Sequence, residues 1–528
     1  MQEPSTNSYT VPLMAKAMLD RFRFLGFGST ASSKYWLTRF VFLRFLGGMY
    51  FVGFLILVNQ GLPLIGENGL LPAKNFLDTL GPRYETTFDA FLKIPTLFWF
   101  HLSDRILVTC AWIGATLSFL VLIGFANVPI LLILWFLYMS FVNIGQTWYG
   151  FGWESQLLET GFLGIFICPL VDPRPFPRSP PPAPVFWLLR WLIFRIHIGA
   201  GMIKIRNDDC WWNLTCMVYH YETQPLPNPL SPWFHFMPSW FHKFEVLWNH
   251  ITELIAPFFV FGPRPFRHLA GLMLVFFQIL LILSGNLSFI NWLTLTASVA
   301  CFDDSFLRHV LPRSITQKAE QAEKYSKSEL WPSRMSYALM ILVFLLSIPV
   351  VQNMMSPRQI MNTSFDRLRL VNTYGLFGTI GKKRHELIIE GTTDESVDTH
   401  TSWRSYEFKA KPGTTDRPLP LISPYHYRLD WQIWFAAMSV PQQHPWVFHL
   451  IWKLLHNDAG ALSLLANNPF PEGPPENIRI EMYRYKFLPP GDESGKVWNN
   501  EHVGTWLNPV SKSTPGFKRL IQKNRWKP

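Results

Sequence analysis

Residues 187–240 read WLLRWLIFRIHIGAGMIKIRNDDCWWNLTCMVYHYETQPLPNPLSPWFHFMPSW and join an apolar run to a polar loop. The run, residues 185–205, is apolar over about 20 residues, which is the length that crosses a hydrocarbon core about 30 Å thick. The prolines of QPLPNPLSP cannot continue this helix, because proline lacks a backbone donor and restricts the residue before it. The stretch therefore predicts a membrane span that leads into an aqueous loop, residues 206–243.

The composition indicates that membrane and aqueous parts share one chain. Of the 528 residues, 49% are hydrophobic and only 16% are charged, and the mean hydropathy is +0.12. The shortage of charge is concentrated in the first two thirds, as expected for a multi-span membrane domain followed by a soluble domain. The net charge of +11 is scattered over loops between apolar runs. It therefore predicts orientation in a membrane and no binding of nucleic acid.

Apolar runs of membrane-spanning length predict the fold class. About nine helical spans are expected, at residues 40–59, 103–125, 128–148, 153–171, 185–205, 244–262, 266–284, 286–302 and 335–353. Some of these runs are short or closely spaced, so the pairs around Ala126, Gly150 and Gly285 also fit re-entrant hairpins. An arrangement with five spans stays open. The expected fold is an α-helical polytopic membrane domain, residues 1–355, followed by a mixed α/β, β-rich C-terminal domain, residues 356–528.

Basic residues in the short loops predict the orientation of these spans, because Lys and Arg favour the cytoplasmic side. Most of them fall on one side of the expected membrane. That set comprises Arg21, Arg23, Lys34, Arg39, Arg174, Arg178, Arg264, Arg267, Arg308, Arg313, Lys318, Lys324, Lys327 and Arg334. We therefore expect a cytosolic N-terminus and a cytosolic linker at residues 303–334. The loop 206–243 and the C-terminal domain are then expected in the lumen.

The C-terminal domain shows alternation typical of strands beside helical spacing. Strands are predicted at HELIIEGT (385–392), SYEFKAK (405–411) and IRIEMYRYKF (478–487), where apolar and polar residues alternate. Between them, WQIWFAAMSV (431–440) and residues 445–468 have helical periodicity. Its dense aromatic residues are expected to pack in a core or against the membrane domain, with a minority left for a client-binding surface.

Several strings in this chain resemble the lipase maturation factor family. They include FRIHIGAGMIKIR (194–206), CWWNLTCM (210–217), YHYETQPLPNP (219–229), GQTWYGFGWESQLLETGFLGIFICPL (145–170) and LISPYHYRLDWQIWFAA (421–437). The resemblance covers nearly the whole chain and is closer to the first of the family's two vertebrate paralogues than to the second. It implies a resident membrane protein of the endoplasmic reticulum, without a cofactor, that supports folding, dimer assembly and secretion of active lipases.

The partners implied by this resemblance are secreted dimeric lipases, namely lipoprotein lipase, hepatic lipase and endothelial lipase. Endoplasmic reticulum chaperones and redox proteins are further candidate partners. We expect the loop 206–243 and the domain after Met355 to form one lumenal platform that holds apolar surface of an unassembled lipase. A lipid carrier, which would use the polar face of the membrane domain, is an alternative function.

A membrane-embedded enzyme is the other alternative, and it would depend on Lys204. The helix ending GAGMIK is similar to a motif of vitamin K-dependent carboxylases, which use a membrane-embedded lysine as a base. A desolvated lysine can act in this way when its pKa falls. Only this short motif matches, so a snorkelling or ion-paired Lys204 is the simpler interpretation, and no catalytic residue is assigned.

Glu154 or Glu159 would be the acidic partner of Lys204 in such an enzyme, because an ionisable group at membrane depth is a candidate functional residue. A structural role is the simpler alternative. Glu154 would then lie at the lumenal interface, and Glu159 would be satisfied by a helix–helix hydrogen bond or by Arg190 or Arg195. No metal site is expected, since the paired Asp303 and Asp304 lack a third ligand at helical spacing and are expected to cap or anchor a helix end.

Two covalent modifications are predicted in the lumenal segments. Cys210 and Cys216 are expected to form a disulfide in an oxidising lumen. A bridge over so short a loop contributes about 2 kcal/mol through chain entropy. Their spacing differs from the C-x-x-C of dithiol oxidoreductases, which favours bracing over a labile, client-directed pair. Asn213 in NLT and Asn362 in NTS are candidate N-glycosylation sites, whereas Asn286 in NLS lies between closely spaced spans and is expected to stay unmodified.

Overall fold

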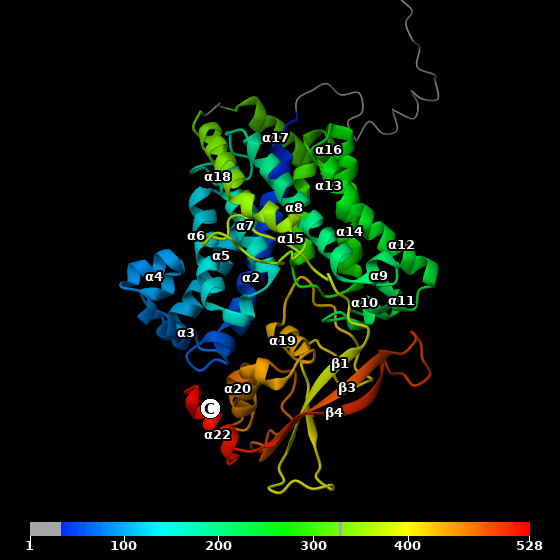
Figure 1. Ribbon diagram of the computed structural model, residues 1–528. Helices are drawn as coiled ribbons and strands as arrows, with labels where there is room; N and C mark the ends of the chain where they lie inside the picture. The colour runs from blue at the N-terminus through cyan, green and yellow to red at the C-terminus, as the bar shows by residue number, and fades with distance from the viewer. Residues whose placement is uncertain (1–32, 327–329, 528) are drawn as a thin grey trace, which may run out of the picture.

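The computed structural model describes residues 33–326 and 330–527, and it consists of a helical bundle followed by a part that contains a β-sheet. Figure 1 shows the bundle at the top and the sheet below it. The predicted fold class is confirmed in this respect. Of the residues used to predict orientation, Arg21, Arg23 and Lys327 lie outside the described residues, as do parts of the expected segments 1–355 and 303–334.

Every apolar run singled out in the sequence is helical. The helices are α2 (Trp36–Ile65), α5 (Asp104–Ile123), α6 (Val128–Ile144), α7 (Gly152–Ile167), α8 (Ala183–Asn207), α12 (Ser239–His250) with α13 (Ala256–Phe259), α14 (Arg264–Ser284), α15 (Ile290–Ser298) and α18 (Leu330–Met355). Within the described ranges, five helices have the length and hydropathy of a membrane span: α2, α5, α8, α14 and residues 334–355 of α18. The others are shorter or interrupted, so the five-span alternative matches the number of long apolar helices.

The long helices leave apolar side chains uncovered by protein. Phe344 on α18 is 70% exposed, and Trp112 on α5 and Phe276 on α14 are each more than half exposed. A soluble protein rarely exposes so much contiguous apolar surface, whereas a bilayer covers it. By contrast, α7 is almost wholly buried inside the bundle. The exposed faces of α5, α14 and α18 therefore suit contact with lipid, whereas the short helix α7 is surrounded by protein.

Paired aspartates tie together the end of the bundle where α2 begins. Asp304 accepts backbone hydrogen bonds from Trp36 (3.1 Å) and Leu37 (2.8 Å), which satisfies the free N–H groups of the first turn of α2. Asp303 binds Arg264 at 2.8 Å and Arg267 at 2.9 Å. α16 (Asp304–Val310) and α17 (Arg313–Lys324) lie at this same end, opposite the sheet (Figure 1). Both aspartates thus cap and anchor helix ends.

The C-terminal part contains a four-stranded antiparallel sheet in the order β2-β1-β3-β4. The strands are β1 (Arg384–Thr392), β2 (Arg404–Tyr406), β3 (Asn477–Phe487) and β4 (Trp498–Val510), and the helices are α19 (Arg428–Ala436), α20 (Pro445–Leu454), α21 (Ala459–Ser463) and α22 (Pro515–Lys523). Ile389 of β1 pairs with Ile480 of β3, and both are fully buried. Figure 1 shows α19 between the sheet and the bundle.

The predicted strand 405–411 is only partly correct, because regular pairing stops at Tyr406. Beyond Tyr406, side chains form the hydrogen bonds to the backbone that a neighbouring strand would otherwise form. The Asp430 carboxylate accepts from the N–H groups of Ala410 and Lys411, and the Arg417 guanidinium donates to the carbonyls of Phe408 and Lys409. Strand β4 and helix α22 were not predicted from the sequence. Strand β4 contains three Asn and few apolar residues in alternation, and helix α22 is short, so neither has a strong periodic signal.

Candidate functional site

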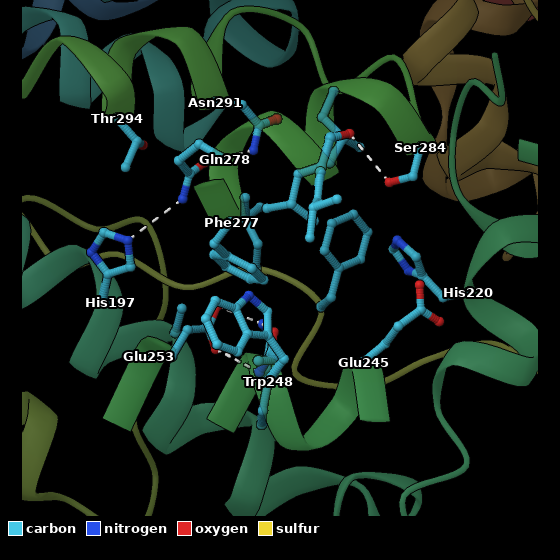
Figure 2. A pocket seen from close by; sticks show the side chains of 18 of the residues that line it. His197, His220, Glu245, Trp248, Glu253, Phe277, Gln278, Ser284, Asn291 and Thr294 are labelled. Atoms are coloured by element: carbon cyan, nitrogen blue, oxygen red, sulfur yellow. Dashed lines mark hydrogen bonds and ion pairs between the residues drawn. The ribbon is translucent and has the colours of Figure 1, made fainter. Parts of the chain in front are cut away.

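A mostly apolar cavity of about 230 Å³ lies where α8, α12, α14 and α15 meet the loop 206–243 and residues 374–377. Figure 2 shows Phe277 and Trp248 between two polar groups of side chains, with His197, Gln278 and Asn291 on one side and His220 and Glu245 on the other. Burial lowers the pKa of His220 to about 4, and the nearby Lys204 charge acts in the same direction. His220 is therefore neutral at neutral pH.

Lys204 lines this cavity as one member of a buried ion pair. Its ammonium group donates to Glu253 Oε1 at 2.7 Å and to Asn249 Oδ1 at 2.8 Å, and Asn249 donates in turn to Glu253 Oε2 at 3.1 Å. The ring of Trp211 lies 4.8 Å from Nζ. This arrangement corresponds to the ion-paired lysine expected from the sequence. The Lys204 ammonium group thus already donates to two acceptors and lies against an aromatic face.

A local change of helical type positions the two acceptors. Between α12 and α13 the chain forms a π-helical turn over Ile251–Ile255, in which Ala256 N–H bonds to the Ile251 carbonyl. Pro257 follows at once and has no N–H to donate to the preceding turn. Single π-turns are frequent at functional sites. The turn brings Glu253 toward α8 while Asn249 stays on the same face, one helical turn earlier.

Glu154 does not lie near this lysine pair but at the contact between α7 and the C-terminal part. The Arg428 guanidinium of α19 donates to Glu154 Oε1 at 2.8 Å, and Tyr138 of α6 donates its hydroxyl to the other carboxylate oxygen. Arg428 also lies over the Tyr149 ring at 3.5 Å. Both partners of the ion pair have no exposed side-chain surface. Glu154 thus forms a buried ion pair between the bundle and the C-terminal part, and its expected position at the lumenal interface of a membrane stays a prediction.

Glu159, one turn further along α7, has a separate set of partners. It pairs with Arg195 of α8, accepts from the Tyr374 hydroxyl at 2.7 Å and accepts from the backbone N–H of Asn372 at 3.0 Å. Tyr374 and Asn372 follow the last span. No contact of the described residues joins Lys204 to either glutamate. The three residues of the speculative enzyme are therefore divided among three different hydrogen-bond networks.

The loop 206–243 forms short helices that pack against the C-terminal part. These are α9 (Asp209–Trp212), α10 (Met217–Thr223) and α11 (Ser231–His235), together with the start of α12. Cys210 and Cys216 are joined by a disulfide between α9 and α10. From β1, the buried Arg384 donates to the carbonyls of Glu222, Gln224 and Pro225. The loop and the sheet therefore form one packed unit.

The sequons differ in their surroundings. Asn213 is exposed at the end of α9. The Asn362 side chain is half-buried and donates to the Gly375 carbonyl at 3.0 Å. Asn286 is fully buried, where it donates to Pro227 and Pro420 carbonyls and accepts from two N–H groups. Of the three sequon asparagines, Asn213 is the exposed one.

Sequence reasoning missed the residues that complete these networks, above all Arg428, Arg384, Glu253 and Asn249. Arg428 lies in the string LISPYHYRLDWQIWFAA and Glu253 in an apolar run that predicts a helix. Both are charged residues in apolar surroundings, and that is the one signal that marks them. Nothing in the local sequence names their partners, which lie about 50 to about 270 residues away.

Comparison with known proteins places the chain among its relatives. The lipase maturation factor transmembrane domain matches residues 37–309, and the lipase maturation factor C-terminal domain matches residues 370–508. Lipase maturation factor 1 of Bos taurus is 48% identical over 90% of this chain and 90% of its own, and that of Homo sapiens is 46% identical over 90% and 88%. Lipase maturation factor 2 of Mus musculus is 29% identical over 92% and 84%. No solved structure matches. The chain belongs to the lipase maturation factor family.

Proposed function

We propose that this protein is a membrane factor needed for the maturation of secreted lipases, and that it acts by binding its client rather than as an enzyme. The observation that carries the proposal is the identity of nearly half its residues to proteins named lipase maturation factor 1, along both the bundle and the C-terminal part. In the proposed mechanism, the protein holds apolar surface of an incompletely assembled lipase until the dimer buries it.

The proposed client surface combines the loop 206–243 with the C-terminal part. Trp212, Trp233 and Trp240 of the loop are 67%, 59% and 68% exposed. Exposed aromatic side chains on a rigid support are typical of protein-binding surfaces. The disulfide and the contacts of Arg384 hold the loop against the sheet, so the aromatic side chains need little ordering when a partner binds.

We further propose that the protein resides in the endoplasmic reticulum membrane with the loop 206–243 and residues 356–528 in the lumen. The loops rich in Lys and Arg gather at the opposite end of the bundle, where Arg39 binds the carbonyls of residues 177 and 179 and Arg264 binds Asp303. Such loops favour the cytosol. The proposed clients are lipoprotein lipase, hepatic lipase and endothelial lipase, with lumenal chaperones and redox proteins as further partners.

The test is the specific activity of lipoprotein lipase secreted from cells that lack any endogenous factor. Expressing this chain should restore activity per unit of secreted lipase mass, and hepatic and endothelial lipase should respond in the same way. A secreted lipase that works as a monomer serves as a control and should not change. No restoration by a stable, correctly located chain would contradict the proposal.

A matched pair of variants tests the client surface. Replacing Trp233 and Trp240 by Ala removes exposed aromatic surface from the loop and should reduce restoration, because these side chains face neither core nor bundle. Trp112→Ala removes a comparably exposed tryptophan, 55% exposed, from the lipid-facing side of α5 and should leave restoration unchanged. Equal activity of both variants would exclude this loop surface as the client site.

A further inference from the structure

The cavity beside Lys204 has the features of a ligand site, and none of the exposed tryptophans Trp212, Trp233 and Trp240 of the proposed client surface lines it. Its volume of about 230 Å³ exceeds the roughly 150 Å³ of an apolar cavity that takes up benzene. Most of its lining is aromatic or aliphatic, with polar groups at its two ends (Figure 2). Ligand sites in proteins commonly combine an apolar wall with a few placed polar groups.

The exposed lining residues show which side of the cavity is open. Phe244 on α12 is 53% exposed and Phe276 on α14 is 51% exposed, although both contribute to the lining. The opening therefore lies between α12 and α14. Because α14 has the length and hydropathy of a membrane span, this opening faces the bilayer side of the bundle. A molecule dissolved in the membrane can enter there without crossing water.

Charge narrows the chemical class of the occupant. The charged side chains in the lining are Lys204, Glu245 and Glu253. The lysine is already bonded to Glu253 and Asn249, and Glu245 accepts from the Tyr221 hydroxyl at 2.5 Å. With one cation against two anions, the lining offers no free positive group to a carboxylate or phosphate. Fatty acid anions and phospholipid headgroups are thus disfavoured, and a neutral ligand is favoured.

One buried acceptor in the lining lacks a partner. Gln156 of α7 has no exposed surface, and its Nε2 donates to Thr294 at 3.0 Å. Its Oε1 accepts no hydrogen bond from the described residues. Leaving such an acceptor unsatisfied costs about 1–3 kcal/mol, so buried amide oxygens are nearly always paired. A hydroxyl group is a neutral donor that can supply this bond.

We propose that the cavity binds a neutral membrane lipid that carries a free hydroxyl group, with its apolar body among the aromatic side chains and its hydroxyl group donating to Gln156. Diacylglycerol and sterols are membrane lipids with this chemistry. The bound lipid would fill the space between α12 and α14 and complete the packing around the buried lysine pair. The site is one of binding within the bundle, lined in part by the inner side of the loop 206–243, whereas the proposed client surface is formed by the exposed Trp212, Trp233 and Trp240 of that loop.

Photo-crosslinking of the purified full chain in lipid nanodiscs tests the proposal. The probes are a diazirine-bearing diacylglycerol and a diazirine-bearing sterol, with phosphatidylcholine and a fatty acid that carry the same photoreactive chain as controls. Labelling of peptides around Phe244 and Phe276 is compared with labelling around Phe344, which faces lipid on α18. At least one hydroxyl lipid should favour the cavity peptides about tenfold over phosphatidylcholine, and which one does so identifies the source.

Matched variants distinguish the cavity from the surrounding lipid-facing surface. Ala200→Leu and Leu281→Trp fill the cavity from two different helices and should abolish the preference, whereas Ile279→Trp adds bulk to the exposed face of α14 outside the lining and should retain it. Gln156→Leu should weaken saturable labelling about fivefold through the lost hydrogen bond. Competition by unlabelled diacylglycerol or sterol on the unaltered chain needs no variant. Equal preference for phosphatidylcholine, insensitivity to filling, or no preference at all would overturn the proposal.

Discussion

Lys204 is buried with its charge compensated, so the effect of a substitution there depends on what happens to Glu253. Lys204→Met leaves the glutamate uncompensated in an apolar wall, and this should lower the free energy of unfolding by about 3–5 kcal/mol. In the double variant Lys204→Met, Glu253→Gln neither position of this pair carries a charge, and the free energy of unfolding should largely return to that of the unaltered chain. If the lysine is structural, lipase maturation should return with it. Thermal unfolding and the secreted lipase assay measure the two quantities.

The matched control for this double variant is Lys527→Met, which breaks an exposed pair with Glu67. Exposed pairs contribute little, so the midpoint of thermal unfolding should hardly move. A double variant that is as stable as the unaltered chain but inactive in lipase maturation would contradict the structural role. Such a result would indicate that the Lys204 side chain takes part in the function of the protein.

Asp430 makes stability depend on pH. Burial raises the pKa of this carboxyl group to about 6, even though the N–H groups of Ala410 and Lys411 act in the opposite direction. The folded state therefore holds a proton that the unfolded chain releases near pH 4, so this contribution to stability falls as pH rises from about 4 to about 6. Asp430→Asn keeps the acceptor Oδ1 and removes the titration. Its advantage over the unaltered chain should grow to about 2–3 kcal/mol by pH 7, measured by thermal unfolding between pH 4 and pH 7.

The exposed sequon Asn213 lies at the end of α9, and the buried sequon Asn286 lies in the turn between α14 and α15. Glycosidase treatment should shift the mobility of the unaltered chain by one glycan, and Asn213→Gln should abolish that shift. Asn362→Gln should not change it. Asn286→Gln should leave the glycan in place but lower the thermal stability, since the Asn286 side chain bonds both the loop 206–243 and residues 420–423. A glycan at Asn286 would contradict the packing of this turn.

The α7 helix shows why two parts that are separate in the sequence are interdependent. Its 16 residues are too few to cross a bilayer as an isolated span, and Glu154, Gln156 and Glu159 would each be costly in lipid. Arg195 of α8 and Arg428 of α19 compensate the two charges. This short polar helix is therefore possible only inside a completed fold.

For the whole molecule, truncation after Met355 should impair the bundle as well as remove the sheet. The truncated chain loses Arg428, so that of the side-chain partners described here Glu154 keeps the Tyr138 hydroxyl. It also loses Asn372 and Tyr374, which bond Glu159. We expect a lower midpoint of thermal unfolding and no lipase maturation. Adding Glu154→Gln to the truncated chain should recover part of the stability but none of the maturation activity, if the C-terminal part binds the client. Recovery of both would mean that the C-terminal part acts only by stabilising the bundle.

Local sequence patterns predicted most of the secondary structure of this protein. The apolar runs predicted all of the long helices, because a run of about 20 apolar residues is helical wherever lipid surrounds it. Alternation predicted β1 and β3, and the two cysteines of the polar loop predicted the bridge that the structure contains. The family resemblance, carried by strings along the whole chain, agrees with the matches to both domains of the family.

Only the tertiary structure decided which charges meet. The sequence offered Glu159 two arginines and left Glu154 and Lys204 without partners, and it suggested that Lys204 could act with Glu154 or Glu159 in one reaction. In the fold, Glu154 meets Arg428, Glu159 meets Arg195 and Lys204 meets Glu253. Helical periodicity gives the face of each residue but not the neighbour across it, because long-range pairing follows from how the helices pack. The cavity arises in the same way, since no single segment contains it.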